Sequence, residues 1–381
     1  MCVCVCTNTA FEQANRRGSC DRHVCPHAGL DAQTHMHART RTNVHTHTHG
    51  QAGPSIRAAR VHKRICMRTH EQTHTHTHTG KQGQTYVLRV YNNGNKTGHV
   101  EYEHELLKAL HAQAPNLSFE LPKFFPVKGG TKTFAEVSNG AQACLCSVIP
   151  GVLPKTTNPQ ILGRAVGELM SALESVKIDL KAPTPPYFNV WDVHTHINPE
   201  AYKEVTEKAD MDFIREHINT LTKLFEECMV RVETYKGALP MQRIHGDLHY
   251  DNCLVAETQD RVTGVLDFEF TAYDWRAMEV AVCLSKYAAE DTPLELMQSF
   301  ISGYAEHGKL NRAEAEAMPD LINLRVFSNV FFFIGRSLAG EDSIVSFTKR
   351  AKMYADRVVW VNANRKAITE AICTQMGAKL E

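Results

Sequence analysis

The stretch IHGDLHYDN at residues 244–252, followed by VLDFEF at 265–270, decides the fold and the chemistry expected of this chain. Asp247 is followed five positions later by Asn252, and Asp267 ends a short apolar run fifteen residues after that. Phosphoryl transfer needs a carboxylate that accepts the proton of the acceptor hydroxyl, and oxygen ligands that hold Mg²⁺ on the nucleotide. The two motifs supply both, so together they predict a phosphoryl-transfer site.

The charge distribution argues against a nucleic-acid partner. The 381 residues carry no net charge, but residues 1–80 contain ten basic and four acidic residues, so the remainder is acidic by six charges. A mildly acidic body is a poor match for a polyanion. No apolar run approaches the roughly 18 residues of a membrane span, so we expect a soluble protein with no membrane contact.

The cysteines indicate a reducing compartment. Six of the twelve lie in the first 80 residues, and the others are scattered among apolar neighbours: Cys144, Cys146, Cys228, Cys253, Cys283 and Cys373. This pattern predicts buried, reduced thiols and a cytoplasmic location rather than a disulfide framework. Cys144 and Cys146 form a lone CxC without partner ligands, which favours core thiols over a metal site.

The first 83 residues have the composition of a translated dinucleotide repeat. Cys-Val alternates over residues 1–6, and Thr-His alternates over 44–49 and 73–79. We expect residues 1–83 to be disordered, because this sequence has no apolar face with which to bury a core. Its twelve histidines could bind metal adventitiously, but nothing orients their rings. The basic balance would also suit a transit peptide, although no amphipathic helix is evident.

Residues 84–149 read as a small β-rich segment. Strands are predicted at 85–91, 119–127, 132–137 and 143–149, with a helix at 99–112. The Pro150-Gly151 pair then suits a hinge.

Residues 150–373 read as a mainly helical segment. Helices are predicted at 160–176, 212–235, 277–288, 293–307, 313–335 and 343–372, and residues 180–200 form a Pro-rich loop. The two motifs therefore lie on a short β-rich insert inside a helical lobe.

With Arg89 in the first strand and Glu103 in the helix after it, HGDxxxxN and DFE resemble the aminoglycoside phosphotransferase and choline kinase family, in its homoserine-kinase-like branch. Residues 267–285 and 301–325 are also similar to that branch, and the resemblance runs from about residue 86 to about residue 362. It implies an α+β, two-lobed, protein-kinase-like fold. The N-lobe would be small, β-rich and truncated, and the C-lobe large and mainly helical.

The resemblance implies roles for individual residues. Asp247 matches the catalytic aspartate, and His245 completes the HGD turn, mainly as a scaffold. Asn252 and Asp267 match the Mg²⁺ ligands. Arg89, paired with Glu103, stands where the family has a lysine and would neutralise the phosphates of ATP. The backbone of the hinge would bind adenine, through Cys146, Ser147 and Ile149. The implied cofactors are ATP and Mg²⁺.

Further polar residues near the motifs are candidates for the acceptor pocket. His249, Asp274 and Arg276 lie close enough in sequence to contact the substrate, but His249 could be an ordinary loop residue, and Asp274 and Arg276 could form an internal ion pair. Glu279 is expected to brace the catalytic loop. The WDVHTH stretch at 191–196 resembles an amidohydrolase metal motif, but the later ligands of that motif are missing, so we interpret it as a loop.

The function expected from these residues is ATP-dependent phosphorylation of a hydroxyl group on a small molecule. A homoserine-like amino alcohol comes first, while choline, ethanolamine, hydroxylysine or a sugar stay open. The alternative is a non-catalytic kinase-fold protein or an inactive fragment, because no glycine-rich lid precedes residue 84. An upstream exon encoding the lost strands would remove that alternative. The sequence predicts nothing about oligomeric state.

Overall fold

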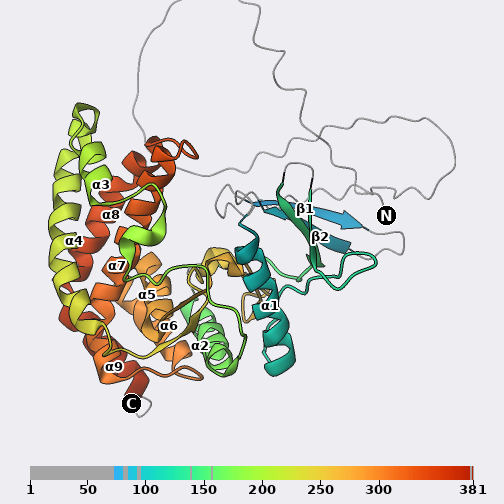
Figure 1. The fold of residues 1–381 in the computed structure, drawn as a ribbon. Coiled ribbons are helices and arrows are strands. Elements are labelled where there is room, and N and C mark those ends of the chain that lie inside the picture. Colours follow the sequence, from blue (N-terminus) through green and yellow to red (C-terminus); the bar gives the residue numbers. More distant parts are fainter. Residues whose placement is uncertain are drawn as a thin grey trace, which may run out of the picture. The chain divides into compact units, whose positions relative to one another are not determined.

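The predicted strand at residues 85–91 organises the small lobe. It forms β2 (Thr85–Tyr91), which pairs antiparallel with β4 (Gln142–Ser147). The other edge of β4 is hydrogen-bonded to β3 (Phe134–Glu136), and with β1 (Thr73–Thr79) the strand order is β1-β2-β4-β3. Helix α1 (Thr97–Gln113) lies beside this sheet (Figure 1). It runs close to the predicted bounds and buries the three leucines that had indicated a helix, Leu106, Leu107 and Leu110.

The computed structural model describes residues 73–79, 85–91, 96–137, 140–155, 158–377 and 380, with the backbone alone described for 73–79. Most of the segment predicted to be disordered therefore lies outside the described residues. At residues 73–79 the structure differs from that prediction, because β1 (Thr73–Thr79) pairs antiparallel with β2. The physical reason is that β2 offers an open edge and threonine suits an extended backbone.

A second difference concerns the strand predicted at residues 119–127. Only isolated bridges form there, Glu120 with Gly264 and Phe124 with Cys146. Pro122 and Pro126 lack the N–H groups that a continuous ladder needs, which explains the interruption.

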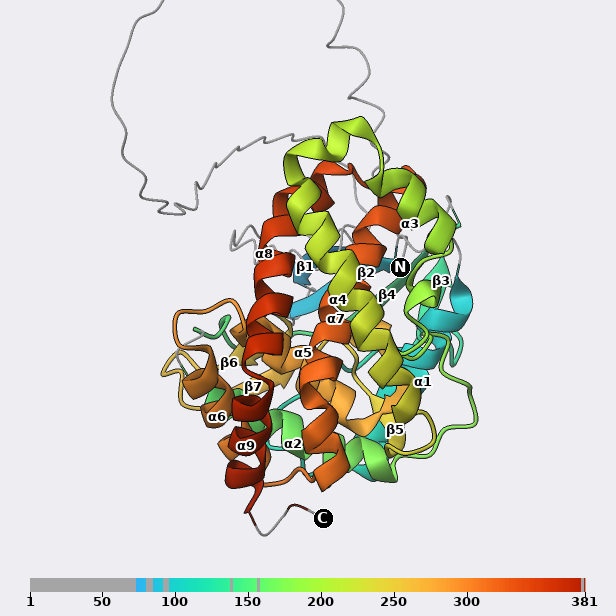
Figure 2. The same cartoon turned by 90° about the vertical axis from the view of Figure 1, so that its left-hand side faces the viewer.

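The large lobe is helical around one extended apolar core. Its α-helices are α2 (Pro159–Ser175), α3 (Pro199–Thr206), α4 (Arg215–Tyr235), α5 (Arg276–Tyr287), α6 (Pro293–Tyr304), α7 (Arg312–Leu338), α8 (Val345–Ala363) and α9 (Arg365–Met376). Figure 2 shows α4, α7 and α8 alongside one another. The single helix predicted at 343–372 is instead divided at Asn364, whose side-chain amide donates to the carbonyl of Trp360 at 2.8 Å. Asparagine commonly ends helices by such local hydrogen bonds.

Helix α7 is long and apolar enough to cross a membrane by length and composition, and it is the one helix of that kind in the described part of the chain. Of its most apolar window, 83% is buried inside the protein, as for the core helix of a globular domain. Its start is fixed by a capping box, in which Asn311 and Glu314 satisfy each other's backbone N–H groups.

Two small antiparallel two-stranded sheets flank the motif residues in the large lobe. Strand β5 (Met241–Ile244) pairs with β8 (Ala272–Trp275), and β6 (Cys253–Val255) pairs with β7 (Val262–Val265). Short 3₁₀ helices lie at Val190–Val193, Ala209–Ile214, Tyr250–Asn252 and Phe268–Phe270. At the predicted hinge, Gly151 has φ +152°, and a Cβ atom there would lie 2.4 Å from Thr263 Oγ1, so the chain passes where only glycine fits.

Candidate active site

The buried carboxylate of Glu279 accepts a hydrogen bond from the HGD turn and holds it in place. Gly246 has φ +82°, and a Cβ atom there would lie 2.4 Å from the carbonyl oxygen of Phe270, which explains the glycine. Its N–H donates to Glu279 Oε2 at 2.9 Å. Burial raises the pKa of Glu279, and its interactions with His245 and with nearby backbone N–H groups oppose that rise. The bracing role expected of Glu279 agrees with this contact.

His245 fixes the loop and does not face the cavity beside the loop. Its Nε2 lies 2.8 Å from the carbonyl oxygen of Leu266, and its Nδ1 accepts the N–H of Asp247 at 3.3 Å. This pattern places the ring proton on Nε2. The ring packs against Phe268 with 4.5 Å between centroids. The histidine thus ties the HGD turn to the DFE segment, as a scaffold would.

The Asp247 carboxylate is restrained at both oxygens. Asn252 Nδ2 donates to the backbone carbonyl of Asp247 at 2.8 Å and to its Oδ2 at 3.1 Å. Arg325 on α7 donates through Nη2 to Oδ1. Asp247 is 3% exposed and lines a cavity, so the predicted base lies where an acceptor could reach it.

Asn252 and Asp267 fit a divalent cation. Asn252 is fully buried, yet its Oδ1 has no hydrogen-bond partner, which is costly unless a donor or cation occupies that position. Asp267 adopts a left-handed backbone conformation with φ +66°, which is uncommon for aspartate and typical of functional sites. A carboxylate and an amide oxygen are ligands of the kind that Mg²⁺ prefers, with phosphates and water completing its shell.

The small lobe reaches the site through Arg89. Its Nη1 donates to Glu103 Oε1 at 2.6 Å, which is the ion pair expected from the sequence. Its Nη2 lies 2.8 Å from Asp267 Oδ1 and 3.4 Å from Glu269 Oε2. Burial raises the pKa of Glu103 and raises that of Glu269 to about 8; repulsion from Asp267 adds to both shifts, whereas Arg89 opposes them.

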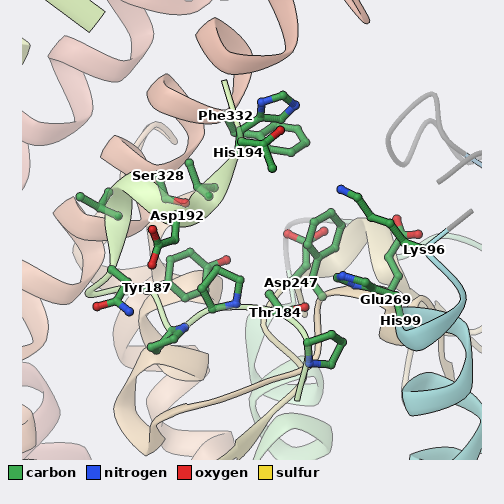
Figure 3. Close-up of a pocket in the computed structure, with 18 of the residues that line it drawn as sticks. Lys96, His99, Thr184, Tyr187, Asp192, His194, Asp247, Glu269, Ser328 and Phe332 are labelled. Carbon is green, nitrogen blue, oxygen red and sulfur yellow. The ribbon is translucent and has the colours of Figure 1, made fainter. Parts of the chain in front are cut away.

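A cavity of about 410 Å³ opens beside Asp247. Its lining comes from the Pro-rich loop at 183–195, the start of α1, and the part of α7 that carries Arg325. Figure 3 shows Tyr187, Asp192 and His194 on one side of the cavity, with Lys96 and His99 on the other. Such a volume suits a small molecule.

Three residues predicted for the acceptor pocket do not line this cavity. His249 lies behind Asp247, with its Nε2 3.6 Å from Asp247 Oδ1. Asp274 accepts the backbone N–H groups of Tyr187 and Trp275, both at 2.6 Å. Arg276 forms a buried ion pair with Glu314 at 2.5 Å. Closeness in sequence was misleading, because β8 and α5 turn these side chains toward partners far along the chain.

The hinge residues predicted to bind adenine lie at the end of β4. Cys146 pairs with Val87, and the N–H of Ser147 donates to the carbonyl of Lys123 at 2.9 Å. The N–H of Ser147 is therefore used within the protein, so a contact of this residue with a nucleotide, which stays a prediction, would use its carbonyl oxygen. Ile149 follows the strand and is buried. A nucleotide contact at Cys146 and Ile149 stays a prediction.

The cysteines of the described residues and His194 have surroundings of their own within the protein. The six cysteines in the described part of the chain are all free. Burial raises the pKa of Cys146 to about 11 and that of Cys144 to about 12, so both are inert thiols. Within the described ranges, no group of three or more His, Cys, Asp or Glu side chains could hold a metal ion. His194 instead packs its ring against Gly335.

Sequence reasoning missed Tyr187 and Arg325, the residues that connect the cavity wall to Asp247. Arg325 Nη1 donates to the Tyr187 hydroxyl at 2.8 Å, and that hydroxyl donates to the carbonyl of Gly246 at 2.6 Å. One signal was available, because Arg325 is the only charged residue in the apolar run 321–334 of α7. A buried charge in such a run needs a partner.

Comparisons with known proteins agree with this geometry. A family model described as the phosphotransferase enzyme family matches residues 71–317. A homoserine kinase of Agrobacterium fabrum is 30% identical over 215 residues, which cover 55% of this chain and 61% of that kinase.

Solved structures place the fold. A microcompartment-associated aminopropanol kinase has a TM-score of 0.59 at 16% identity, covering 79% of this chain and 92% of that one. An aminoglycoside phosphotransferase from Alicyclobacillus acidocaldarius has a TM-score of 0.56 at 14% identity, covering 83% and 97%. The fold is therefore the predicted two-lobed, protein-kinase-like one, with a small β-containing N-lobe and a mainly helical C-lobe.

Proposed function

The chain belongs to the phosphotransferase enzyme family, and from that premise we propose that it transfers the γ-phosphoryl group of ATP to a hydroxyl group of a small molecule. One observation carries the proposal. The buried Asn252 Oδ1, left without a partner, lies on the side chain that also holds Asp247 at the cavity. A cation ligand and a proton acceptor are thus built into one short loop, as phosphoryl transfer requires.

Each of the site residues has a separate role in the proposed reaction. Asp247 orients the acceptor hydroxyl and accepts its proton, because its carboxylate lies at the cavity and is held at both oxygens. Asn252 and Asp267 hold Mg²⁺, which supplies positive charge against the phosphates. Arg89, oriented by Glu103, adds a further positive charge on the nucleotide side.

A homoserine-like amino alcohol is the first candidate for the acceptor. The homoserine kinase relative and the fold shared with an aminopropanol kinase both support this class. The cavity adds Asp192, an exposed carboxylate without a hydrogen-bond or ion-pair partner among the described residues, and it suits an ammonium group. Choline, ethanolamine, hydroxylysine and a sugar remain in the candidate set. A cytoplasmic location belongs to the same proposal.

The alternative, a non-catalytic protein of the same fold, is not favoured. A protein that had lost catalysis would have no need for a cavity-lining aspartate restrained at both oxygens, nor for a buried amide oxygen kept without a partner. Both features carry a folding cost that chemistry would explain.

The proposal is tested by incubating the protein with Mg·ATP and each candidate acceptor, and by detecting the phosphate ester by mass spectrometry. We expect a product with homoserine or another amino alcohol, and none with 2-aminobutyrate, which lacks the hydroxyl of homoserine. Asp192→Asn should raise KM for cationic acceptors and leave KM for neutral sugars unchanged. Absence of a phosphorylated product across the panel would contradict the proposal.

A further inference from the structure

Arg325 links three separate parts of the site. One arm of its guanidinium, Nη2, donates to Asp247 Oδ1, and the other arm, Nη1, donates to the Tyr187 hydroxyl at 2.8 Å. Tyr187 lies 60 residues before Asp247 and Arg325 lies 78 residues after it. The contact therefore joins helix α7, the Pro-rich wall of the cavity and the catalytic loop.

This link is anchored at each end. The Tyr187 hydroxyl donates to the carbonyl of Gly246 at 2.6 Å, and its backbone N–H donates to Asp274 at 2.6 Å. Arg325 is 9% exposed, and its guanidinium carbon lies 5.6 Å from the centroid of the Tyr187 ring. A buried guanidinium with two directed hydrogen bonds has little freedom to move.

The two carboxylate oxygens of Asp247 accept hydrogen bonds from different residues. Asn252 Nδ2 contacts Oδ2 at 3.1 Å, and Arg325 contacts Oδ1. Arg325 and Asn252 together fix both oxygens. Without Arg325, Oδ1 would keep the more distant His249 Nε2, at 3.6 Å, and the carboxylate could turn about the Asn252 contact at Oδ2. A carboxylate oxygen can accept more than one hydrogen bond, so an acceptor hydroxyl can bind Asp247 beside these residues. The guanidinium stays charged, so it takes no part in proton transfer itself.

We propose that Arg325 is a positioning residue, which holds the Asp247 carboxylate toward the acceptor and couples its orientation to the cavity wall through Tyr187. The inference rests on the proposed function. It goes beyond the HGDxxxxN and DFE motifs, because neither motif contains Arg325 or Tyr187.

A competing role for Arg325 is direct binding of an anionic group on the acceptor. Its Nε is buried without a partner, and the residue lines the cavity. The two roles differ in kinetics. Loss of a positioning contact lowers kcat, whereas loss of a binding contact raises KM for the acceptor.

The test compares Arg325→Met, Arg325→Lys and Tyr187→Phe with the matched control Arg365→Met. Arg365 also forks onto a buried carboxylate, Asp320, at 2.7 and 2.6 Å, but neither residue lines the cavity. We expect kcat to fall about 100-fold in Arg325→Met, because a misplaced reacting group costs on this order. Arg325→Lys should recover part of that loss. Tyr187→Phe should lower kcat by roughly three- to tenfold, and the control should keep the wild-type kcat.

Crystal structures of the same proteins give a reading that does not depend on turnover. In Arg325→Met we expect the Asp247 carboxylate to turn about its contact with Asn252, so that Oδ1 leaves its wild-type position while Oδ2 stays within about 3.5 Å of Asn252 Nδ2. If Arg325→Met does not fold, Arg325→Lys and Tyr187→Phe carry both measurements. An unmoved carboxylate, or a raised acceptor KM at unchanged kcat, overturns the positioning role. Failure of the wild type to phosphorylate any acceptor would instead overturn the proposed function, and the crystal structures would still decide the position of Asp247.

Discussion

The catalytic loop (residues 245–252) and the β2 strand of the small lobe both bring charge to one site, but they hold it differently. In the catalytic loop, His245 and Gly246 are fixed by contacts to Leu266 and Glu279 within the large lobe. The small lobe contributes Arg89, which contacts Asp267, 178 positions away in sequence. The geometry of the catalytic loop is therefore fixed by contacts within the large lobe, whereas the position of Arg89 at the site depends on how closely the two lobes approach. Substitutions in the first should lower kcat, and those in the second should weaken nucleotide binding.

The largest effect expected on the large-lobe side, apart from loss of the base, is that of Asp267→Asn. We expect kcat to fall roughly 10²- to 10³-fold, because a preorganised charge beside the phosphates is lost. Activity should recover in part at high Mg²⁺ concentration, since an amide oxygen binds the cation more weakly than a carboxylate. ADP release measured against Mg²⁺ concentration gives the answer. Asp260→Asn, in the exposed turn between β6 and β7, is the control. An unchanged Mg²⁺ requirement in Asp267→Asn would contradict the role of Asp267 as a metal ligand.

Substitution of Arg89 tests the contribution of the small lobe to nucleotide binding. Arg89→Met should weaken binding of a non-hydrolysable ATP analogue about 10- to 100-fold, the value of a charge-assisted hydrogen bond. Arg89→Lys should stay within a few-fold of wild type, because it keeps the positive charge. Calorimetric titration measures both affinities. Since Arg89→Met leaves the buried Glu103 unpaired, the double variant Arg89→Met/Glu103→Gln separates nucleotide binding from folding. If nucleotide affinity is unchanged in both, Arg89 does not contact the phosphates.

Substitution of Glu279 measures how much this carboxylate stabilises the catalytic loop. Glu279→Ala leaves the N–H of Gly246 without its acceptor in a fully buried position, so we expect the free energy of unfolding to fall by roughly 1–3 kcal/mol. Denaturant unfolding measures this. Glu306→Ala, which breaks an ion pair with Arg164 at the surface, should change stability by about 1 kcal/mol or less. Equal effects in the two variants would show that the brace is unimportant.

Asp274 gives the smallest effect and depends on pH. Burial raises its pKa to about 7, against the two backbone N–H groups that favour the charged form. Below that pH the folded protein binds a proton that the unfolded chain has already released. Its contribution to stability therefore falls as pH rises between about 5 and 7, by at most about 1.4 kcal/mol per pH unit. Thermal melts across this range should show a flatter dependence for Asp274→Asn. Identical slopes would mean that Asp274 is charged throughout.

The same comparison shows what the sequence could predict. Asp247, Asn252 and Asp267 fall within 21 residues, so their spacing alone indicated a common site. Periodicity placed Arg89 on a strand and Glu103 on a helix, the resemblance to a kinase-like family implied that they pair, and they do form an ion pair. Arg325 and Tyr187 come from segments 78 and 60 positions away, and only tertiary packing brings them to Asp247. The substrate contacts considered for Asp274 and Arg276 were missed for the same reason, because their partners, Tyr187 and Glu314, lie far from them in sequence. For Arg276 the alternative, an internal ion pair, is what forms.

The secondary structure was predictable where hydrophobic periodicity was strong. The prediction was wrong where a single residue interrupts a strand or a helix. The leucines of α1 and the apolar face of α2 marked helices correctly. Two prolines interrupted the strand expected at 119–127, and Asn364 divided the last helix, although the periodicity around each continued. Strand β1 was missed because a Thr-His repeat has no apolar face and pairs only where a neighbouring edge is open.

The account depends most on Asp247 as the group that accepts the acceptor's proton. The most direct test is phosphorus NMR of wild type and Asp247→Ala with Mg·ATP and the acceptor that gives the best turnover. We predict a phosphate ester with the wild type and a kcat lower by roughly 10²- to 10⁴-fold in the variant, with nucleotide affinity and melting temperature near those of wild type. Ester formation by Asp247→Ala at the wild-type rate would contradict the account.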